Sequence, residues 1–294
     1  MALIDKLKAI ADGFRSARGT TDPLTLDEMA VLAAEPVGGD TNELEQSFID
    51  IIEGNSVKTS LPSGLTKIGD YAFYNSSNLA LSDLPDGVTS IGRYAFYNCE
   101  NLNITDLPNG LTSIGDKAFQ NCFNIEVLSL PDGVTQIGMS AFYGCSKISW
   151  TTLPNSVTTI GASAFSGCSN LALTSLPDGI TEIASQTFNN CSNLRITALP
   201  DKVTTVGSSA FYGCVGLTGL SISATINRID SDAFRDCTGL LEVTFKRKPY
   251  SMQSNIFRNC TNLLTINVPW AEGEVANAPW GATNATINYN YTGE

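Results

Sequence analysis

The chain has 294 residues, of which 43% are hydrophobic, and its 17 basic and 29 acidic residues give it a net charge of −12. This hydrophobic content suffices for a substantial core, whereas the negative charge argues against nucleic acid as a partner, because phosphates attract basic surfaces. No stretch approaches the roughly 18 apolar residues of a membrane span, so membrane insertion is not expected. Histidine is absent, which excludes His-based triads, general bases and metal ligands. No pair of acids stands out either, so we expect no enzyme, no cofactor and no metal site.

The first 56 residues carry no repeat. Apolar residues at helical spacing, and a capping-box pattern that begins at Thr25, predict a helical hairpin over residues 1–36. We interpret the hairpin as a docking or homo-oligomerisation element. Residues 37–43 predict a linker, and residues 44–56 predict an amphipathic helix that caps the N-terminal end of the next region.

A 23-residue repeat occupies residues 57–267. Phenylalanine marks every step, at Phe73, Phe96, Phe119, Phe142, Phe165, Phe188, Phe211, Phe234 and Phe257. Cysteine follows three residues later, at Cys99, Cys122, Cys145, Cys168, Cys191, Cys214, Cys237 and Cys260. Columns of Leu or Ile, of Leu-Pro steps and of Ile or Val keep the same phase. A unit this short cannot bury its own apolar face, so we expect stacked coils whose like side chains form ladders in one core.

Each repeat divides into three parts. Residues such as Leu102–Thr105 predict a short strand. Pro-Asp-Gly, as in Pro85–Gly87, predicts a turn, and Gly92–Asn98 predicts a short helical or 3₁₀ segment. The predicted fold class is α/β: a solenoid with one parallel β-sheet face and short helical or 3₁₀ segments opposite, preceded by a small helical hairpin.

The eight cysteines allow three interpretations. They could form a disulfide framework or a metal site, or they could be buried free thiols. Because all eight stand in one repeat column, their side chains should point the same way, and parallel side chains form disulfides poorly. We therefore favour buried free thiols that act as small core residues.

The pattern Ile-Gly-x-x-Ala-Phe-x-x-Cys-x-x-Leu, followed by Leu-Pro-x-x-Val, resembles the BspA-like class of leucine-rich repeats. The resemblance covers about three quarters of the chain and implies a leucine-rich repeat solenoid that binds other molecules. BspA-like surface proteins usually carry a secretion signal and a sorting element, and we see neither. We expect a virion protein, which leaves the cell by lysis, to need neither.

The two ends have a second resemblance. The helical hairpin and the stretch from Val268 to Ala282 are similar to the ends of phage and prophage tail-associated proteins of gut Firmicutes. Residues 268–294 predict a C-terminal cap in which Trp270 and Trp280 cover the open end of the core. Thr286–Tyr291 predicts a final strand.

The strand columns are where a solenoid usually binds partners. Two positions past the repeat Leu, the early repeats carry apolar residues that include Leu81, Ile104, Trp150, Leu173 and Ile196. In the later repeats the apolar residue moves to the third position. The early coils either expose an apolar stripe, which would then be the tentative partner-binding site, or contain a bulge that keeps it inside. Burial is the simpler interpretation, because an exposed stripe of this size risks aggregation.

Two further sets of side chains are candidates. Tyrosines flank the phenylalanine column, at Tyr71, Tyr74, Tyr94, Tyr97, Tyr143 and Tyr212, and they either pack on the convex side or contact a protein or glycan. Turn acids recur at Asp86, Asp132, Asp178 and Asp201. They form either ordinary turns or a weak cation-binding row.

Three functions remain open. The first is a phage or prophage tail-associated protein that recognises a host surface, located in the virion. The second is a BspA-like adhesin at the bacterial cell surface that binds host matrix proteins. The third and weakest is a carbohydrate-active enzyme on a repeat scaffold. In the first two, the expected partner is a protein or a cell-surface glycan.

Overall fold

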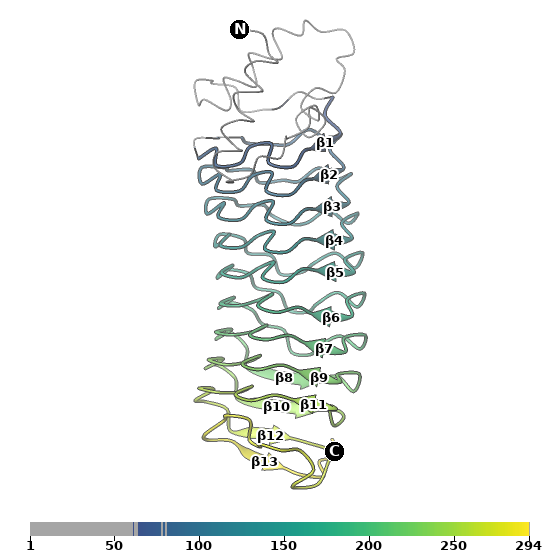
Figure 1. Ribbon diagram of the computed structural model, residues 1–294, viewed down its shortest axis with the longest axis vertical. Helices are drawn as coiled ribbons and strands as arrows, with labels where there is room; N and C mark the ends of the chain where they lie inside the picture. The colour runs from purple at the N-terminus through teal and green to yellow at the C-terminus, as the bar shows by residue number, and fades with distance from the viewer. Residues whose placement is uncertain (1–60, 62–63, 78, 80, 294) are drawn as a thin grey trace, which may run out of the picture.

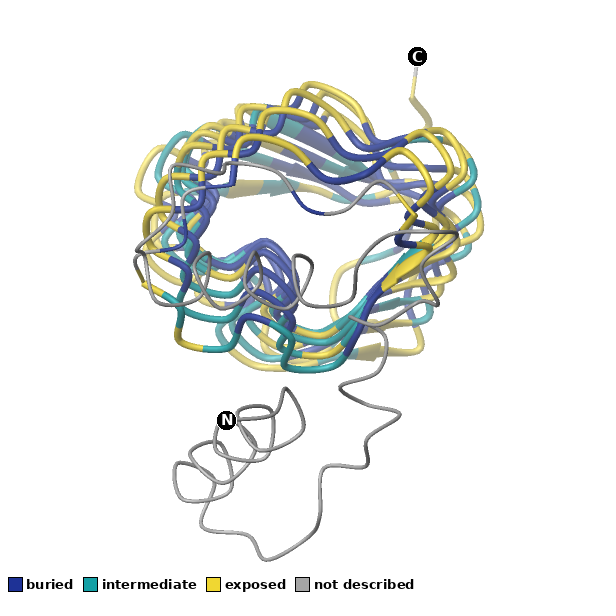
Figure 2. Ribbon diagram, turned by 90° about the horizontal axis from the view of Figure 1, so that it is seen from above, coloured by how far each residue is buried: buried dark blue, intermediate teal, exposed yellow. Residues whose placement is uncertain are grey.

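The computed structural model of the chain describes residues 61, 64–77, 79 and 81–293. The predicted hairpin at 1–36, the linker at 37–43 and the cap helix at 44–56 lie outside these residues. From residue 64 onward the chain winds through successive coils that lie one above the next along the long axis (Figure 1). Viewed along this axis, buried residues line the inside of every coil and exposed residues form its corners (Figure 2).

Short parallel strands join the coils in three sheets. The first sheet has the order β1-β2-β3-β4-β5, and its strands are Lys67–Ile68, Ser90–Ile91, Ser113–Ile114, Gln136–Ile137 and Thr159–Ile160. The second has the order β6-β7-β9-β11, and its strands are Glu182–Ile183, Thr205–Val206, Arg228–Ile229 and Ser251–Met252. The third has the order β8-β10-β12-β13, and its strands are Gly219–Ile222, Glu242–Phe245, Thr265–Asn267 and Thr286–Asn288. The fold is a parallel β-solenoid in which each strand pairs with the same position of the next coil.

The predicted position of the strands is wrong for the early coils. Leu102–Thr105 forms no strand, and the early strands instead lie on the Ile column, as in β2. The predicted position becomes a strand only from β8 onward, in the coils where the apolar residue has moved to the third place. There, side chains alternate between partly exposed and buried along β8 (Gly219–Ile222), which is the pattern that a strand with one buried face requires.

The predicted helical or 3₁₀ segments are also wrong, since no helix occurs among the described residues. The segment around Phe96 is a series of turns in which Tyr94 and Asn98 have positive φ angles of 54° and 57°. Left-handed residues interrupt a right-handed helix. They also direct alternate amides to the next coil: the N–H of Phe96 donates to the Ala118 carbonyl at 2.7 Å. Backbone groups that a helix would satisfy internally are therefore satisfied between coils.

The core consists of side-chain ladders. The nine phenylalanines are fully buried and stack on one another, with ring centroids 5.1–5.7 Å apart in neighbouring coils. All eight cysteines are buried and unpaired. Each thiol donates a hydrogen bond to a phenylalanine carbonyl of the preceding coil, with Sγ–O distances of 2.9–3.1 Å.

The C-terminal end of the core is covered by aromatic rings. Trp270 and Trp280 are 4% and 1% exposed, and their ring centroids lie 5.4 Å and 6.1 Å from that of Phe245. Trp280 also joins the last coil through its backbone, because its carbonyl accepts the N–H of Phe257 at 3.0 Å. The predicted final strand is present as β13 (Thr286–Asn288), which is shorter than Thr286–Tyr291.

Candidate binding surfaces

The predicted apolar stripe lies inside the solenoid. Its members Leu81, Ile104, Trp150, Leu173 and Ile196 are at most 2% exposed. The Trp150 ring packs edge-on against Phe142 and Phe165, and its Nε1 donates to the Val127 carbonyl at 2.7 Å. These five side chains cannot contact a partner while they are buried. The early coils avoid exposing them because this stretch is not a regular strand, so its side chains need not alternate between two faces.

The tyrosines beside the phenylalanine column form a cluster on the first two coils. We call Tyr71, Tyr74, Tyr94 and Tyr97 the tyrosine cluster. Tyr71 stacks on Tyr94 with centroids 4.8 Å apart, and Tyr74 stacks on Tyr97 at 5.0 Å. Lys117 of the following coil donates to the Tyr94 hydroxyl at 2.8 Å, with its ammonium 4.9 Å from the ring centroid. The Tyr94 ring is therefore covered by Tyr71 on one coil and by Lys117 on the next, while its edge stays partly exposed.

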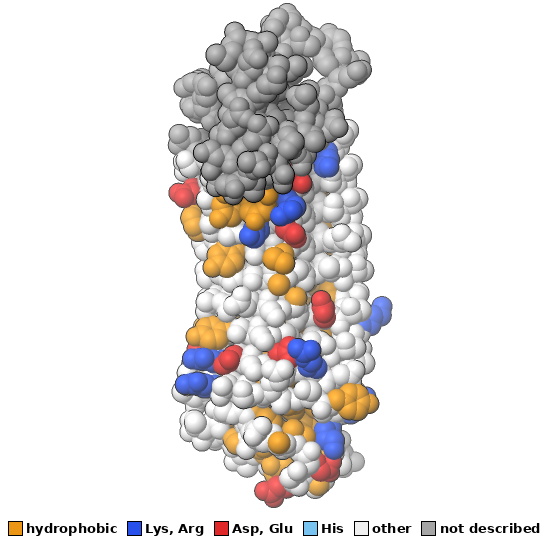
Figure 3. Space-filling view, in the orientation of Figure 1, with side chains coloured by type: hydrophobic (Ala, Val, Ile, Leu, Met, Phe, Trp, Pro, Cys, Tyr) orange, Lys and Arg blue, Asp and Glu red, His pale blue; other side chains and the backbone are white. Residues whose placement is uncertain are grey.

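More exposed apolar side chains lie on the third and fourth coils. Phe123, Tyr143 and Met139 are 43%, 41% and 49% exposed. On the face shown in Figure 3, hydrophobic side chains gather on the N-terminal coils and again near the C-terminal end, whereas much of the middle of the face carries uncharged polar side chains. Later coils carry residues such as Ser163 and Asn189 in the same columns. Among the described residues, stacked tyrosines therefore occur only on the first two coils, whereas later coils carry single aromatic side chains such as Tyr212 and Tyr250.

A family model described as "BspA type Leucine rich repeat region (6 copies)" matches residues 52–172 and 170–277. These two ranges cover most of the chain. The chain belongs to the BspA type leucine-rich repeat family. No curated protein matches it.

Solved structures of other leucine-rich repeat proteins are similar. A leucine-rich repeat protein of T. pallidum is 33% identical, with 54% of this chain and 76% of that chain covered and a TM-score of 0.46. A leucine-rich cell surface protein from Faecalibacterium prausnitzii A2-165 is 25% identical, with 81% of each chain covered and a TM-score of 0.43. The pneumococcal vaccine antigen PcpA is 20% identical, with 78% of this chain and 62% of that chain covered and a TM-score of 0.55. PcpA supports the fold alone.

The turn acids of the BspA type repeats are not gathered into a site. Asp86, Asp132, Asp178 and Asp201 all lie on exposed turns. In the described part of the chain, no group of three or more Cys, Asp or Glu side chains is placed to hold a metal ion. Nor do these residues include a helix long and apolar enough to cross a membrane.

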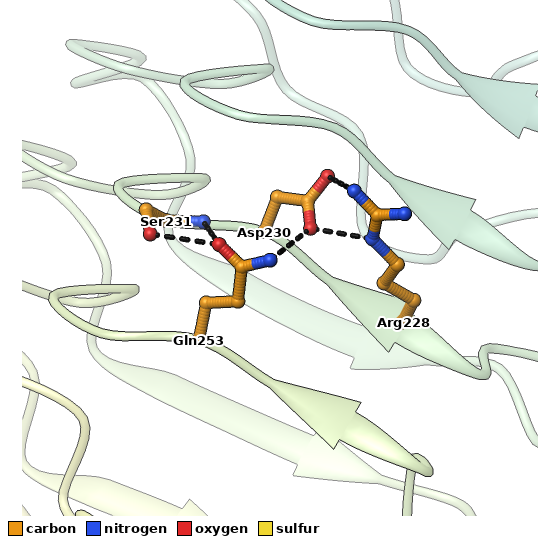
Figure 4. A network of polar contacts seen from close by, with 4 residues as sticks. All are labelled: Arg228, Asp230, Ser231 and Gln253. Carbon is orange, nitrogen blue, oxygen red and sulfur yellow. Dashed lines mark hydrogen bonds and ion pairs between the residues drawn. The ribbon is translucent and has the colours of Figure 1, made fainter.

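A side-chain network that departs from the repeat lies between the last strands of the second sheet (Figure 4). Asp230, which is 6% exposed, stands where most BspA type coils of this chain have glycine. Both of its oxygens accept hydrogen bonds from Arg228, at 2.6 Å and 2.8 Å. The side-chain amide of Gln253 donates a third hydrogen bond to Asp230 at 2.9 Å, and its oxygen accepts one from the Ser231 hydroxyl. Every group in this network has a partner, so we assign it a structural role in joining two coils.

One group of surface residues was missed in the sequence. Lys246–Tyr250 reads Lys-Arg-Lys-Pro-Tyr where an early coil reads Pro-Asp-Gly-Val-Thr at Pro85–Thr89. The signal was available, since this is the densest group of basic residues in an acidic chain. Comparison of the repeat columns does not reveal this basic group, because its residues depart from the repeat.

Proposed function

We propose that this chain is a non-catalytic binding protein that contacts a protein partner through the tyrosine cluster and through Phe123, Met139 and Tyr143 on the next two coils. The observation that carries the proposal is the stacked tyrosine cluster on the first two coils, together with the exposed Phe123, Met139 and Tyr143 on the next two. Ordinary convex-side packing would place similar residues on every coil. Exposed apolar patches of this kind mark interaction sites.

The stacking within the cluster favours a protein over a glycan as the partner. A sugar ring binds an aromatic side chain through the open face of that ring. Both faces of Tyr94 are covered, by Tyr71 and by Lys117, and one face of Tyr97 is covered by Tyr74. The cluster presents ring edges and hydroxyl groups, which suit the mixed apolar and hydrogen-bonding contacts of protein interfaces.

Two biological settings follow from the sequence resemblances. The ends of the chain resemble phage tail-associated proteins, so our first proposal is host recognition by a virion. Membership of the BspA type family supports the second, an adhesin at the bacterial cell surface. In both, the solenoid is the part that contacts the partner, and residues 1–36 serve docking or homo-oligomerisation. An enzymatic role is the weakest proposal, because no catalytic set of residues supports it.

Binding of the fluorescently labelled full chain to intact gut Firmicutes cells and to immobilised collagen, laminin and fibronectin tests the proposal. Tyr94→Ser with Tyr97→Ser should reduce binding by about tenfold, as expected for buried aromatic contacts in an interface. Tyr212→Ser is the matched control, because Tyr212 occupies the same repeat column as Tyr97 on a later coil.

The pattern of targets separates the two settings. Binding to cells alone supports host recognition by a virion, and binding to matrix proteins supports the adhesin. Protease treatment of the target should abolish binding. Equal binding by wild type and the double variant, or binding that survives protease but not periodate, would contradict a protein partner at this surface.

A further inference from the structure

One edge of the solenoid changes its charge along the axis. In early coils this edge carries the turn acids, as at Asp86 and Asp178. Seven coils after Pro85–Gly87, the same three positions are occupied by Lys246, Arg247 and Lys248, all of which are exposed. Lys202 lies in the column of Lys248, two coils earlier. Because coils pair as neighbouring strands at about 4.8 Å, this column places the cations of Lys202 and Lys248 roughly 10 Å apart along the axis.

The loop that carries these cations is held in place at both ends. The backbone N–H of Lys246 donates to the Ile222 carbonyl at 3.0 Å, and that of Ser251 donates to the Asn227 carbonyl at 3.0 Å. Pro249 is buried between them. Because the backbone is anchored, little ordering is needed when a ligand binds, which favours affinity.

Tyr250 completes the group. It is 83% exposed, more than any other large hydrophobic side chain among the described residues. The Arg247 guanidinium lies 5.1 Å from its ring centroid and also donates to Asn227 Oδ1 at 2.6 Å. No other described ring stacks on Tyr250, in contrast to Tyr94, so a face of the Tyr250 ring is open.

A carboxylate of the chain already forms an ion pair with one of the cations. Glu274 Oε2 lies 2.6 Å from Lys248 Nζ. The hydrogen bond from Lys248 lowers the pKa of the Glu274 carboxyl. The pair shows that the edge accommodates a carboxylate, and it identifies Glu274 as a competitor for any anionic ligand.

We propose that Lys202, Lys246, Arg247, Lys248 and Tyr250, here named the basic edge, bind an anionic polysaccharide. The cations pair with the carboxylate, sulfate or phosphate groups of the polymer, and the open face of Tyr250 stacks on a sugar ring. The axial spacing of Lys202 and Lys248 suits an extended polymer that carries charges along its length. This surface and this ligand differ from those of the protein-binding function proposed above, so each can fail without the other.

Binding of the full chain to immobilised polygalacturonate, with neutral dextran of the same length as the reference, tests the inference. Wild type should bind polygalacturonate and not dextran. Lys246→Ala with Arg247→Ala should weaken binding about fivefold, because each substitution removes one exposed ion pair of modest strength and the two losses add in free energy. Lys67→Ala with Lys147→Ala removes the same charge from distant coils and should leave binding unchanged.

Two further variants test the mechanism. Glu274→Gln should strengthen binding about twofold, because it releases Lys248 from an exposed ion pair. Tyr250→Ala should weaken binding, whereas Tyr250→Phe, which keeps the ring, should not. Because all these side chains are exposed, the variants should melt at the wild-type temperature. Melting curves measured in parallel check that a loss of binding is not caused by unfolding.

Several outcomes would overturn the inference. These are equal binding to dextran, equal losses in the basic-edge and distant double variants, and equal binding to poly-glutamate, which would indicate an acidic protein as the ligand. Sulfated and phosphate-linked glycans in further arms identify which anionic group is preferred. Binding should weaken between about 0.05 M and 0.15 M salt because exposed charges are screened.

Discussion

At the scale of single residues, the cysteine column shows how one side chain serves both packing and hydrogen bonding. A thiol is small and apolar enough for the core, yet it can donate weakly to a carbonyl. In Cys145 the Sγ–O distance to Phe119 is 3.0 Å. A serine would fit the space but would exchange a weakly hydrated thiol for a strongly hydrated hydroxyl. Burial also raises the pKa of the seven thiols from Cys99 to Cys237, to about 12 for Cys99 and further for the other six.

The thiols should be unreactive in the folded protein. The thiolate is the reactive species, and burial both hinders access and disfavours ionisation. We expect an aromatic disulfide reagent at pH 8 to modify none of the eight cysteines in native protein and all eight in guanidinium chloride. Rapid native labelling of any one of them would contradict its position in the core.

The same thiols should make stability depend on alkaline pH. The folded-state pKa values of the seven thiols from Cys99 to Cys237 lie above the ordinary value of 9.0, so above pH 9 the unfolded chain releases protons that the folded chain keeps. The contribution of these thiols to the free energy of unfolding is thus fully present below pH 9. It falls as the pH rises, by up to about 1.4 kcal/mol per thiol per pH unit. Urea unfolding between pH 8 and pH 11 measures this. A midpoint that does not change over this range would refute it.

At the scale of a single coil, the backbone conformation is set by contact with the neighbouring coils. A Cβ atom on Gly138 would lie 2.5 Å from the backbone of Gly115 and Asp116. Glycine is therefore required where two coils approach closely. Asn98 and Asn121 illustrate a related requirement, since both have positive φ angles, which asparagine tolerates better than most residues. Asn121 also donates to Asn98 Oδ1 at 2.8 Å. The asparagines that permit the turns therefore also join neighbouring coils.

Two glycine substitutions should distinguish the steric effect of closely spaced coils from the general effect of replacing a flexible glycine. Gly138→Ala should destabilise the protein by about 1–3 kcal/mol, because backbone atoms must move to accept the methyl group. Gly110→Ala is the matched control: the nearest atoms lie 3.8 Å from its added Cβ, so it should be neutral or slightly stabilising. Denaturant unfolding compares them. Equal stability of the two variants would contradict the close approach.

At the scale of the whole molecule, each coil contacts mainly the next, so stability is expected to be distributed along the axis. The ends then decide where unfolding begins. At the C-terminal end, Trp280 closes the core against Phe245, and its Nε1 donates to the Ala276 carbonyl at 3.0 Å. The change of charge along the turn edge that carries Asp86 and Lys248 is also a property at this scale, because it appears only when coils far apart in sequence are aligned.

Removal of this closing ring should destabilise the end more than the middle. Trp280→Ala is expected to cost about 3–5 kcal/mol, as for a large buried aromatic residue. Hydrogen exchange should accelerate around Phe257 and Phe234, with little change around Phe119. Tyr250→Ala, an exposed aromatic on a neighbouring coil, should change neither. Uniform acceleration over all coils would show that the solenoid unfolds as one unit.

The sequence by itself determined the period, the ladders of like side chains and the membership of a stacked-repeat fold, because identical residues at a fixed interval can be buried only against their own copies. Tertiary structure alone decided where the strands lie. Leu102–Thr105 has the residues of a strand, but backbone pairing between early coils occurs at Ser90–Ile91 and its equivalents. It also decided that Gly92–Asn98 forms turns, since the amides there bond to the next coil. The burial of Trp150 likewise depends on an irregular backbone path that hydrophobic alternation cannot reveal. The physical reason is common to all three: in a solenoid, the partner of each backbone group lies one coil away, and local sequence carries no record of which groups face it.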